Sequence, residues 1–157
     1  MLAVGSRAPE FEALDQDDRI RTLAEFLSAG PLLLYFYPAD FTPGCTQEAC
    51  GIRDIHPELA RAGLTLVGAS PQSPDSHRRF RERYSLPFTL LADPDKRVIR
   101  AYRAAGPLGL GVRRITYLIG QDGLVSGAVT ADFRIARHTE FVRAAITAAT
   151  AAGAHRD

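Results

Sequence analysis

Several residue types are nearly absent from this chain of 157 residues. It contains two cysteines, one methionine and no tryptophan, and Lys96 is its only lysine, so arginine supplies nearly all of its positive charge. Nineteen basic and 18 acidic side chains leave a net charge of +1. Such a balance provides no electrostatic footprint for nucleic acid or for an anionic membrane. We therefore expect a protein that binds neither.

Long apolar stretches and targeting signals are also missing. No apolar run approaches the roughly 20 residues that a membrane span needs. The start, Met1-Leu-Ala-Val-Gly-Ser-Arg7, does not place an apolar segment after a charged one. Both absences favour the cytoplasm, where two cysteines serve redox or metal chemistry more often than a structural disulfide. The length and the 46% share of hydrophobic residues predict one globular domain, residues 1–157.

Apolar runs and turn signals predict alternating strands and helices. The expected strands are a small hairpin within 11–20, then 31–37, 64–70, 88–91, 114–119 and 124–129. The expected helices are 22–30, 45–63 with a kink or a new start at Pro57, 73–84, a short turn opened by Asp93-Pro94, and 138–152. Parallel βαβ units followed by an antiparallel pair and a closing helix indicate an α/β fold. We expect a thioredoxin-like sandwich with a mixed central sheet flanked by helices.

Both cysteines lie just beyond the buried strand 31–37, at the sheet edge where open α/β proteins build their sites. Pro43 and Gly44 form a turn, and Cys45 follows where a helix begins. The positive end of the helix dipole and the unpaired N–H groups there favour a thiolate, which is the reactive form of cysteine. The alternative is a buried structural cysteine. The polar surroundings of Cys45 favour the chemical interpretation.

The spacing Pro38-x-x-x-Thr42-x-x-Cys45 suits a small polar ligand. Pro38 fixes the backbone at the strand exit and provides an apolar wall. Thr42 brings a hydroxyl close to the sulfur, where it can donate to or accept from that ligand. The three residues together predict a pocket beside the thiol.

Cys50 is five residues further along the same expected helix. On a continuous helix this separates the two Cα atoms by about 9 Å, whereas a disulfide tolerates at most about 7 Å. Either Cys50 is a core residue, or the first turns of the helix unwind to allow a bond. A zinc site is not expected, because it needs four ligands and the nearby His56 and His77 lack a matching spacing.

The segment Tyr35–Asp54 resembles the active-site segment of peroxiredoxins, and it is similar to the bacterioferritin comigratory protein (peroxiredoxin Q) group. The resemblance extends to the segments 5–11 and 114–119 and to Asp122-Gly123. It implies a thiol peroxidase that reduces hydrogen peroxide and organic hydroperoxides with no metal, flavin or haem. Cys45 would be the peroxidatic residue and Cys50 the resolving one, in a pocket completed by Pro38, Thr42 and Arg114.

The resemblance also implies a reaction cycle and partners. The Cys45 sulfenic acid would give a Cys45–Cys50 disulfide, which thioredoxin or a similar dithiol reductant would reduce. We expect a monomer or a weak homodimer. Phe41 and Gly120 depart from the residues usual in the family and could alter the geometry of their loops.

Three further side chains have more than one interpretation. Successive strand residues point to opposite faces, so Arg113 and Arg114 are not expected to face the same pocket. The pattern does not choose between them, and the resemblance selects Arg114. Glu48, one turn after Cys45, either orients an arginine or relays a proton, or is an exposed helix carboxylate. His138 is expected at the surface or as a helix cap.

A second function stays open on the same fold. A redox-sensing or thiol-disulfide exchange protein would bind a partner and show little peroxidase turnover, and the fold alone does not separate the two. Exchange sites favour two cysteines two residues apart. The wider spacing here, together with Thr42 and Arg114, favours a small oxygen ligand.

Overall fold

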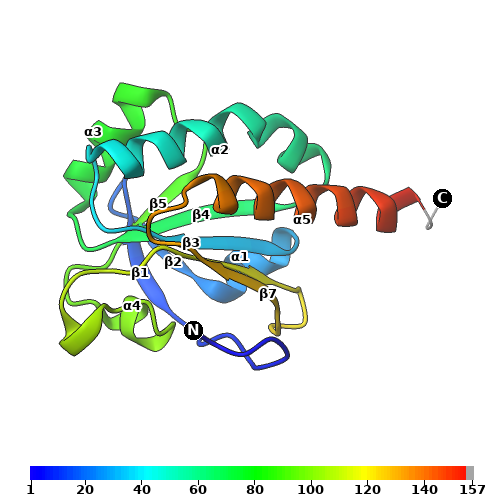
Figure 1. Cartoon of the computed structure of the whole chain (residues 1–157), viewed down its shortest axis with the longest axis horizontal. Coiled ribbons are helices and arrows are strands. Elements are labelled where there is room, and N and C mark those ends of the chain that lie inside the picture. Colours follow the sequence, from blue (N-terminus) through cyan, green and yellow to red (C-terminus); the bar gives the residue numbers. More distant parts are fainter. Residues whose placement is uncertain (155–157) are drawn as a thin grey trace.

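The structure, a computed structural model, describes residues 1–154. Helices and strands alternate through most of it (Figure 1). The strands are β1 (Glu12–Asp15), β2 (Ile20–Thr22), β3 (Leu32–Phe36), β4 (Thr65–Ser70), β5 (Thr89–Ala92), β6 (Ile115–Ile119) and β7 (Val125–Thr130). The helices are α1 (Leu23–Ala29), α2 (Pro43–Arg61), α3 (Pro74–Tyr84), α4 (Arg97–Ala101), the 3₁₀ turn η1 (Pro107–Gly109) and α5 (Ala136–Ala154).

The seven strands form one mixed sheet in the order β2-β1-β5-β4-β3-β6-β7. β3, β4 and β5 run parallel, and the remaining pairs are antiparallel. In Figure 1, α2 and α3 lie on one side of the sheet and α4 on the other, while α5 runs alongside α2. This confirms the predicted mixed sheet flanked by helices.

The strand β3 divides the interior into two cores. Leu32, Leu34 and Phe36 belong to one cluster, which also contains Phe26 of α1 and Tyr102. Leu33 and Tyr35 belong to the other, which holds residues of α2, α3 and α5 and includes Cys45. Because side chains alternate along a strand, a continuous apolar run such as β3 is buried on both faces. The thiol therefore lies on the α2–α3–α5 face of the sheet.

Two helix starts form as the sequence predicts. The Thr22 hydroxyl accepts a hydrogen bond from the Glu25 amide (3.2 Å), and the Ser73 hydroxyl accepts one from the Ser76 amide (3.2 Å). Each hydroxyl satisfies an N–H that has no partner within its own helix. Pro74 follows Ser73 at the first helical position, where its missing N–H costs nothing.

The helix α2 differs from its prediction at both ends and in the middle. It begins at Pro43, two residues before Cys45, and it continues past Pro57 to Arg61 as one element. A proline inside a helix removes one backbone hydrogen bond. Buried Ile52, Ile55 and Leu59 line the face of α2 that packs on the sheet and α5, and this packing offsets the loss.

Two other expectations are wrong. The helical turn expected from Asp93 begins only at Arg97; instead the Asp93 carboxylate accepts from the amide of Ile99 (2.7 Å). His138 is neither at the surface nor a cap, because it lies inside α5 and is 1% exposed. Among the helices of residues 1–154, none is both long enough and apolar enough to cross a membrane.

Candidate active site

Cys45 lies in the first turn of α2, directly beyond the end of β3. Thr42, the residue before α2, is extended (φ −72°, ψ 149°), and its carbonyl accepts the first helical hydrogen bond from the amide of Thr46 (2.9 Å). The Cys45 side chain is only 2% exposed. Amides in a first helical turn have no partner within the helix, so they favour negative charge at this position.

Arg114 reaches Cys45 from the residue just before β6. Its Nη2 lies 3.2 Å from the Cys45 Sγ, and its own backbone amide donates to Asp132 Oδ1 (2.9 Å). Gly44 permits this approach, because a Cβ there would lie 3.0 Å from Nη2. The guanidinium lies at hydrogen-bonding distance from the sulfur, where it can stabilise negative charge that develops there.

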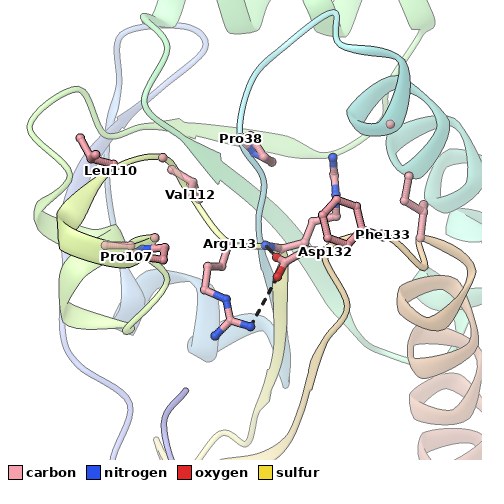
Figure 2. Close-up of a pocket in the computed structure, with 13 residues that line it drawn as sticks. Pro38, Pro107, Leu110, Val112, Arg113, Asp132 and Phe133 are labelled. Carbon is pink, nitrogen blue, oxygen red and sulfur yellow. Dashed lines mark hydrogen bonds and ion pairs between the residues drawn. The ribbon is translucent and has the colours of Figure 1, made fainter.

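The expectation that Arg113 and Arg114 avoid the same pocket is wrong. Both line one pocket, where Figure 2 shows Arg113 beside Asp132. Only Arg114 contacts the sulfur. β6 begins at Ile115, so the strict alternation of a strand does not apply to the two arginines. Arg113 pairs instead with Asp132, with its Nη2 3.4 Å from Oδ2.

Glu48 is a buried carboxylate rather than an exposed one. It is 0% exposed, and its Oε2 lies 3.6 Å from Nη1 of Arg114, which is an ion-pair distance but too long for a hydrogen bond. Within residues 1–154, neither carboxylate oxygen has a hydrogen-bond partner. Burial raises the pKa of Glu48 to about 7, against the opposing effect of Arg114. The carboxyl group therefore changes charge near neutral pH.

Cys50 lies further along the unbroken α2 and is partly buried. Both Cys45 and Cys50 are free thiols. In a continuous helix this spacing keeps their Cα atoms about 9 Å apart, which is beyond disulfide range.

The pocket beside Cys45 is bordered by Pro38, Gly44 and Arg114. In Figure 2, Pro107, Leu110 and Val112 stand on one side of it and Phe133 on the other. Phe133 is 98% exposed and Leu110 is 72% exposed. The mouth of the pocket therefore presents exposed apolar side chains beside the Arg113–Asp132 pair, and the Arg114 guanidinium is buried.

Thr42 is the residue before α2, and it is not among the described residues that line this pocket. Its hydroxyl donates to the Ala39 carbonyl (3.0 Å), so the oxygen keeps its lone pairs for a ligand that donates a hydrogen bond.

His138 supports the wall of the pocket from behind. Burial lowers the pKa of His138, which keeps its ring neutral. Its Nε2–H donates to the Ala131 carbonyl (3.1 Å), and its Nδ1 accepts from the Thr116 hydroxyl (2.9 Å). This pair of bonds ties the segment before Phe133 to β6.

Sequence reasoning missed a buried polar cluster between the Cys45 loop and α3. Asp40 and His77 form an ion pair there, with 2.7 Å between Oδ2 and Nδ1. One signal was available: His77 lies three residues before the buried Phe80 and so shares its helix face. Among residues 1–154, no three His, Cys, Asp or Glu side chains group as a metal ion would require.

Comparison with known proteins shows the family to which the chain belongs. The family model described as AhpC/TSA family matches residues 4–128. A protein named peroxiredoxin bcp in Coxiella burnetii is 39% identical over 131 residues, which cover 80% of this chain and 86% of that protein. Chloroplastic peroxiredoxin Q of Oryza sativa subsp. japonica is 38% identical over 135 residues, covering 85% of this chain and 62% of that one.

Solved structures agree with the sequence relatives. Peroxidoxin BcpB of Mycobacterium tuberculosis has a TM-score of 0.87 at 33% identity, covering 94% of this chain and 98% of its own. The bacterioferritin comigratory protein of Xanthomonas campestris, described for its alkyl peroxide reduction activity, has a TM-score of 0.81 at 29% identity, with coverage of 88% and 90%. The predicted thioredoxin-like fold is thereby confirmed.

Proposed function

The chain belongs to the AhpC/TSA family and is a peroxidase of the peroxiredoxin type, and we propose that Cys45 is the residue that reduces the peroxide. The observation that carries this proposal is the 3.2 Å contact between Arg114 Nη2 and Cys45 Sγ at the first turn of a helix. A buried thiol held against a guanidinium has little structural purpose, but it suits a nucleophile.

The proposed first step is an in-line attack of the Cys45 thiolate on one peroxide oxygen. The S–O bond forms as the O–O bond breaks, so that sulfur is oxidised to the sulfenic acid and the peroxide is reduced. The leaving oxygen takes up a proton and departs as water or an alcohol. Arg114 stabilises the negative charge as it moves from sulfur to the leaving oxygen.

Pro38 and Thr42 complete the proposed peroxide site. Thr42 Oγ1 is occupied as a donor by Ala39, so it is suited to accept a hydrogen bond from the peroxide O–H. Pro38 lines the pocket with apolar surface that keeps water from the reacting atoms. Neither residue needs to change charge during the reaction.

Glu48 is the proposed accessory residue. Its Oε2 faces Nη1 of Arg114, while Nη2 of the same guanidinium contacts Cys45. The ionised form of Glu48 therefore shares the Arg114 cation with the thiolate. Its neutral form leaves that cation to sulfur. We assign Glu48 to the orientation and charge balance of Arg114.

Cys50 is the proposed resolving residue. Its thiol would attack the Cys45 sulfenic acid, releasing water and forming a Cys45–Cys50 disulfide. The intact α2 holds the two residues apart, so this step requires the first turns of the helix to open. A thioredoxin-type dithiol protein would then reduce the disulfide.

The pocket supports both hydrogen peroxide and organic hydroperoxides as substrates. Its inner end is polar at Arg114, where the O–O group would bind, and its mouth is apolar at Leu110 and Phe133. An alkyl group can lie along that mouth. The alkyl peroxide activity described for the Xanthomonas campestris relative supports the same substrate class.

A turnover assay tests the proposal. Reduced protein, thioredoxin, thioredoxin reductase and NADPH are mixed with hydrogen peroxide or cumene hydroperoxide, and peroxide loss is followed. We expect many turnovers per protein molecule with the parent chain and none with Cys45→Ser. Oxidation of the protein without continued turnover would favour the redox-sensing or thiol-exchange alternative.

A further inference from the structure

A set of buried and partly buried polar side chains beside the Cys45 loop has no part in the chemistry proposed above. Three donors converge on the carboxylate of Asp40. Tyr37 Oη donates to Oδ1 (2.6 Å), while Ser76 Oγ (2.8 Å) and His77 Nδ1 (2.7 Å) both lie at Oδ2. Asp40 is 8% exposed and His77 is 0% exposed. We call Tyr37, Asp40, Ser76 and His77 the Asp40 cluster.

The hydrogen bonds of the Asp40 cluster define its charge. The second ring nitrogen of His77, Nε2, lies 3.0 Å from the carbonyl oxygen of Leu91 in β5. Both ring nitrogens thus face acceptors, so the ring carries both protons and pairs with an ionised carboxylate. Burial, then the neighbouring Tyr35 and Asp40, raise the pKa of Tyr37, which keeps its phenol a donor. The result is a buried ion pair anchored to α3 and β5.

The next residue, Phe41, has a strained backbone. Its φ is +66°, in the left-handed region that aromatic residues seldom adopt. Its ring packs on Phe80 of α3, with 5.2 Å between centroids, but it remains 46% exposed. A strained conformation persists only where its surroundings hold it. Here the Asp40 cluster before Phe41 and the start of α2 after it hold the backbone of Phe41 in this conformation.

Further hydrogen bonds connect Asp40 to residues of the peroxide pocket. The Asp40 amide donates to Gln72 Oε1 (3.0 Å), and Gln72 Nε2 donates to the Pro38 carbonyl (3.2 Å). Ala39 lies between Pro38 and Asp40 in the chain, and its carbonyl accepts a hydrogen bond from Thr42 Oγ1 (3.0 Å). Displacing Asp40 therefore displaces both Pro38 and Thr42.

We propose that the Asp40–His77 ion pair positions the peroxide pocket: it holds the strained turn at Phe41 and so sets Pro38 and Thr42 relative to Cys45. The inference rests on the proposed peroxidase function. Asp40 and His77 touch neither the substrate nor the sulfur and are positioning residues. Arg114 reaches Cys45 from the residue before β6, and its backbone amide donates to Asp132; it makes no hydrogen bond to the Asp40 cluster. The pocket and the thiolate are therefore supported separately.

This separation gives a test with two readouts. In a Cys50→Ser background, Cys45 is the only thiol that can react. Two rates are measured on the reduced protein: oxidation by one equivalent of peroxide and alkylation by iodoacetamide. Asp40→Ala should slow the peroxide reaction by about tenfold or more, as displaced catalytic groups do. Alkylation needs the thiolate but not the pocket, so its rate should change by less than about twofold.

Two more variants keep the test decisive. If Asp40→Ala does not fold, Tyr37→Phe replaces it, because it keeps the ring and removes one hydrogen bond to Asp40; we expect a fall of about fivefold in the peroxide rate. Tyr102→Phe is the matched control: it removes a hydrogen bond to the Pro9 carbonyl in the opposite core and should leave both rates unchanged.

The outcomes separate this inference from the function on which it rests. A parent chain that fails to react with peroxide would refute the proposed function. If the parent reacts, a folded Asp40→Ala or Tyr37→Phe variant with a peroxide rate within twofold of the parent would overturn the positioning role. So would an equal fall in both rates, since the cluster would then act on the thiolate.

Discussion

At the scale of single residues, the site depends on one buried cation shared by two acids. Arg114 lies between the Cys45 sulfur and the Glu48 carboxylate, and all three side chains are buried. A charge in the interior is stable only when it is paired. The one guanidinium of Arg114 lies within reach of both side chains.

Loss of Arg114 should therefore cost more than loss of Arg113. Arg114→Ala removes the group that stabilises both the thiolate and the leaving oxygen, and we expect peroxide oxidation to slow by about a hundredfold or more. Arg113→Ala is the matched control, because Arg113 lines the same pocket without touching sulfur. Stopped-flow kinetics of the reduced proteins measure both. A larger loss in Arg113→Ala would contradict the assignment.

The stability of the protein should depend on the charge of Glu48. Burial raises its pKa from 4.5 to about 7, so the folded chain holds a proton that the unfolded chain releases. The stabilisation due to the neutral carboxyl is complete below about pH 4.5 and is lost as pH rises to about 7, a change of up to about 3 kcal/mol.

Glu48→Gln removes this titration and isolates its effect. The free energy of unfolding of Glu48→Gln, minus that of the parent, should grow between pH 5 and pH 7.5. Urea unfolding at several pH values measures the difference. A difference that stays constant over this range would mean that Glu48 does not change protonation on folding.

At the scale of elements, sequence reasoning found α2 but placed both of its ends two residues too late. Pro43 and Gly44 predicted a turn, and they form the first turn of the helix. Pro57 predicted a kink or a new start, and the helix continues through it without a new start. Local signals report what one residue prefers, whereas packing against the sheet and α5 decides whether the helix continues. The alternation applied to Arg113 and Arg114 failed for a similar reason, since β6 begins one residue later.

The burial of Glu48 and His138 could not be predicted from the sequence. Each is a polar residue on a helix, where a solvent-exposed position is the ordinary expectation. Their burial depends on partners distant in the chain, such as Arg114 for Glu48 and Thr116 for His138. Such pairings follow from the packed fold and not from local pattern.

The helix α2 should open on oxidation. The reduced chain holds Cys45 and Cys50 about 9 Å apart in an intact helix, which a disulfide does not tolerate. Hydrogen exchange should therefore be faster across 46–54 in the oxidised protein, with protection of β3 and β4 unchanged. Unchanged protection of 46–54, with the disulfide proven by mass spectrometry, would refute the prediction. Cys50→Ser is the control that cannot form the bond.

At the scale of the whole molecule, the fold places an apolar entrance in front of a polar centre. The segments 106–112 and 131–135 supply the entrance, and they come from connections beyond β5 and β7. That residues 1–157 make one domain stays a prediction. The two cores on either side of one continuous sheet support it, and a single cooperative unfolding transition is what we expect.

The entrance should matter for bulky substrates only. Phe133→Ser removes exposed apolar surface at the pocket mouth, and we expect kcat/KM to fall about fivefold for cumene hydroperoxide but to stay unchanged for hydrogen peroxide. Ile20→Ser is the control, because Ile20 is also exposed and apolar but lies on the edge strand β2. Equal effects on the two peroxides would show that Phe133 does not contact the alkyl group.

The most direct test of the central claim is the intact mass of the reduced protein after one equivalent of peroxide. The parent should lose two hydrogens as the Cys45–Cys50 disulfide forms. Cys50→Ser should gain one oxygen at Cys45, located by dimedone trapping, and Cys45→Ser should keep its mass. A Cys45→Ser protein that is oxidised as fast as the parent would contradict the assignment of Cys45 as the peroxide-reducing residue.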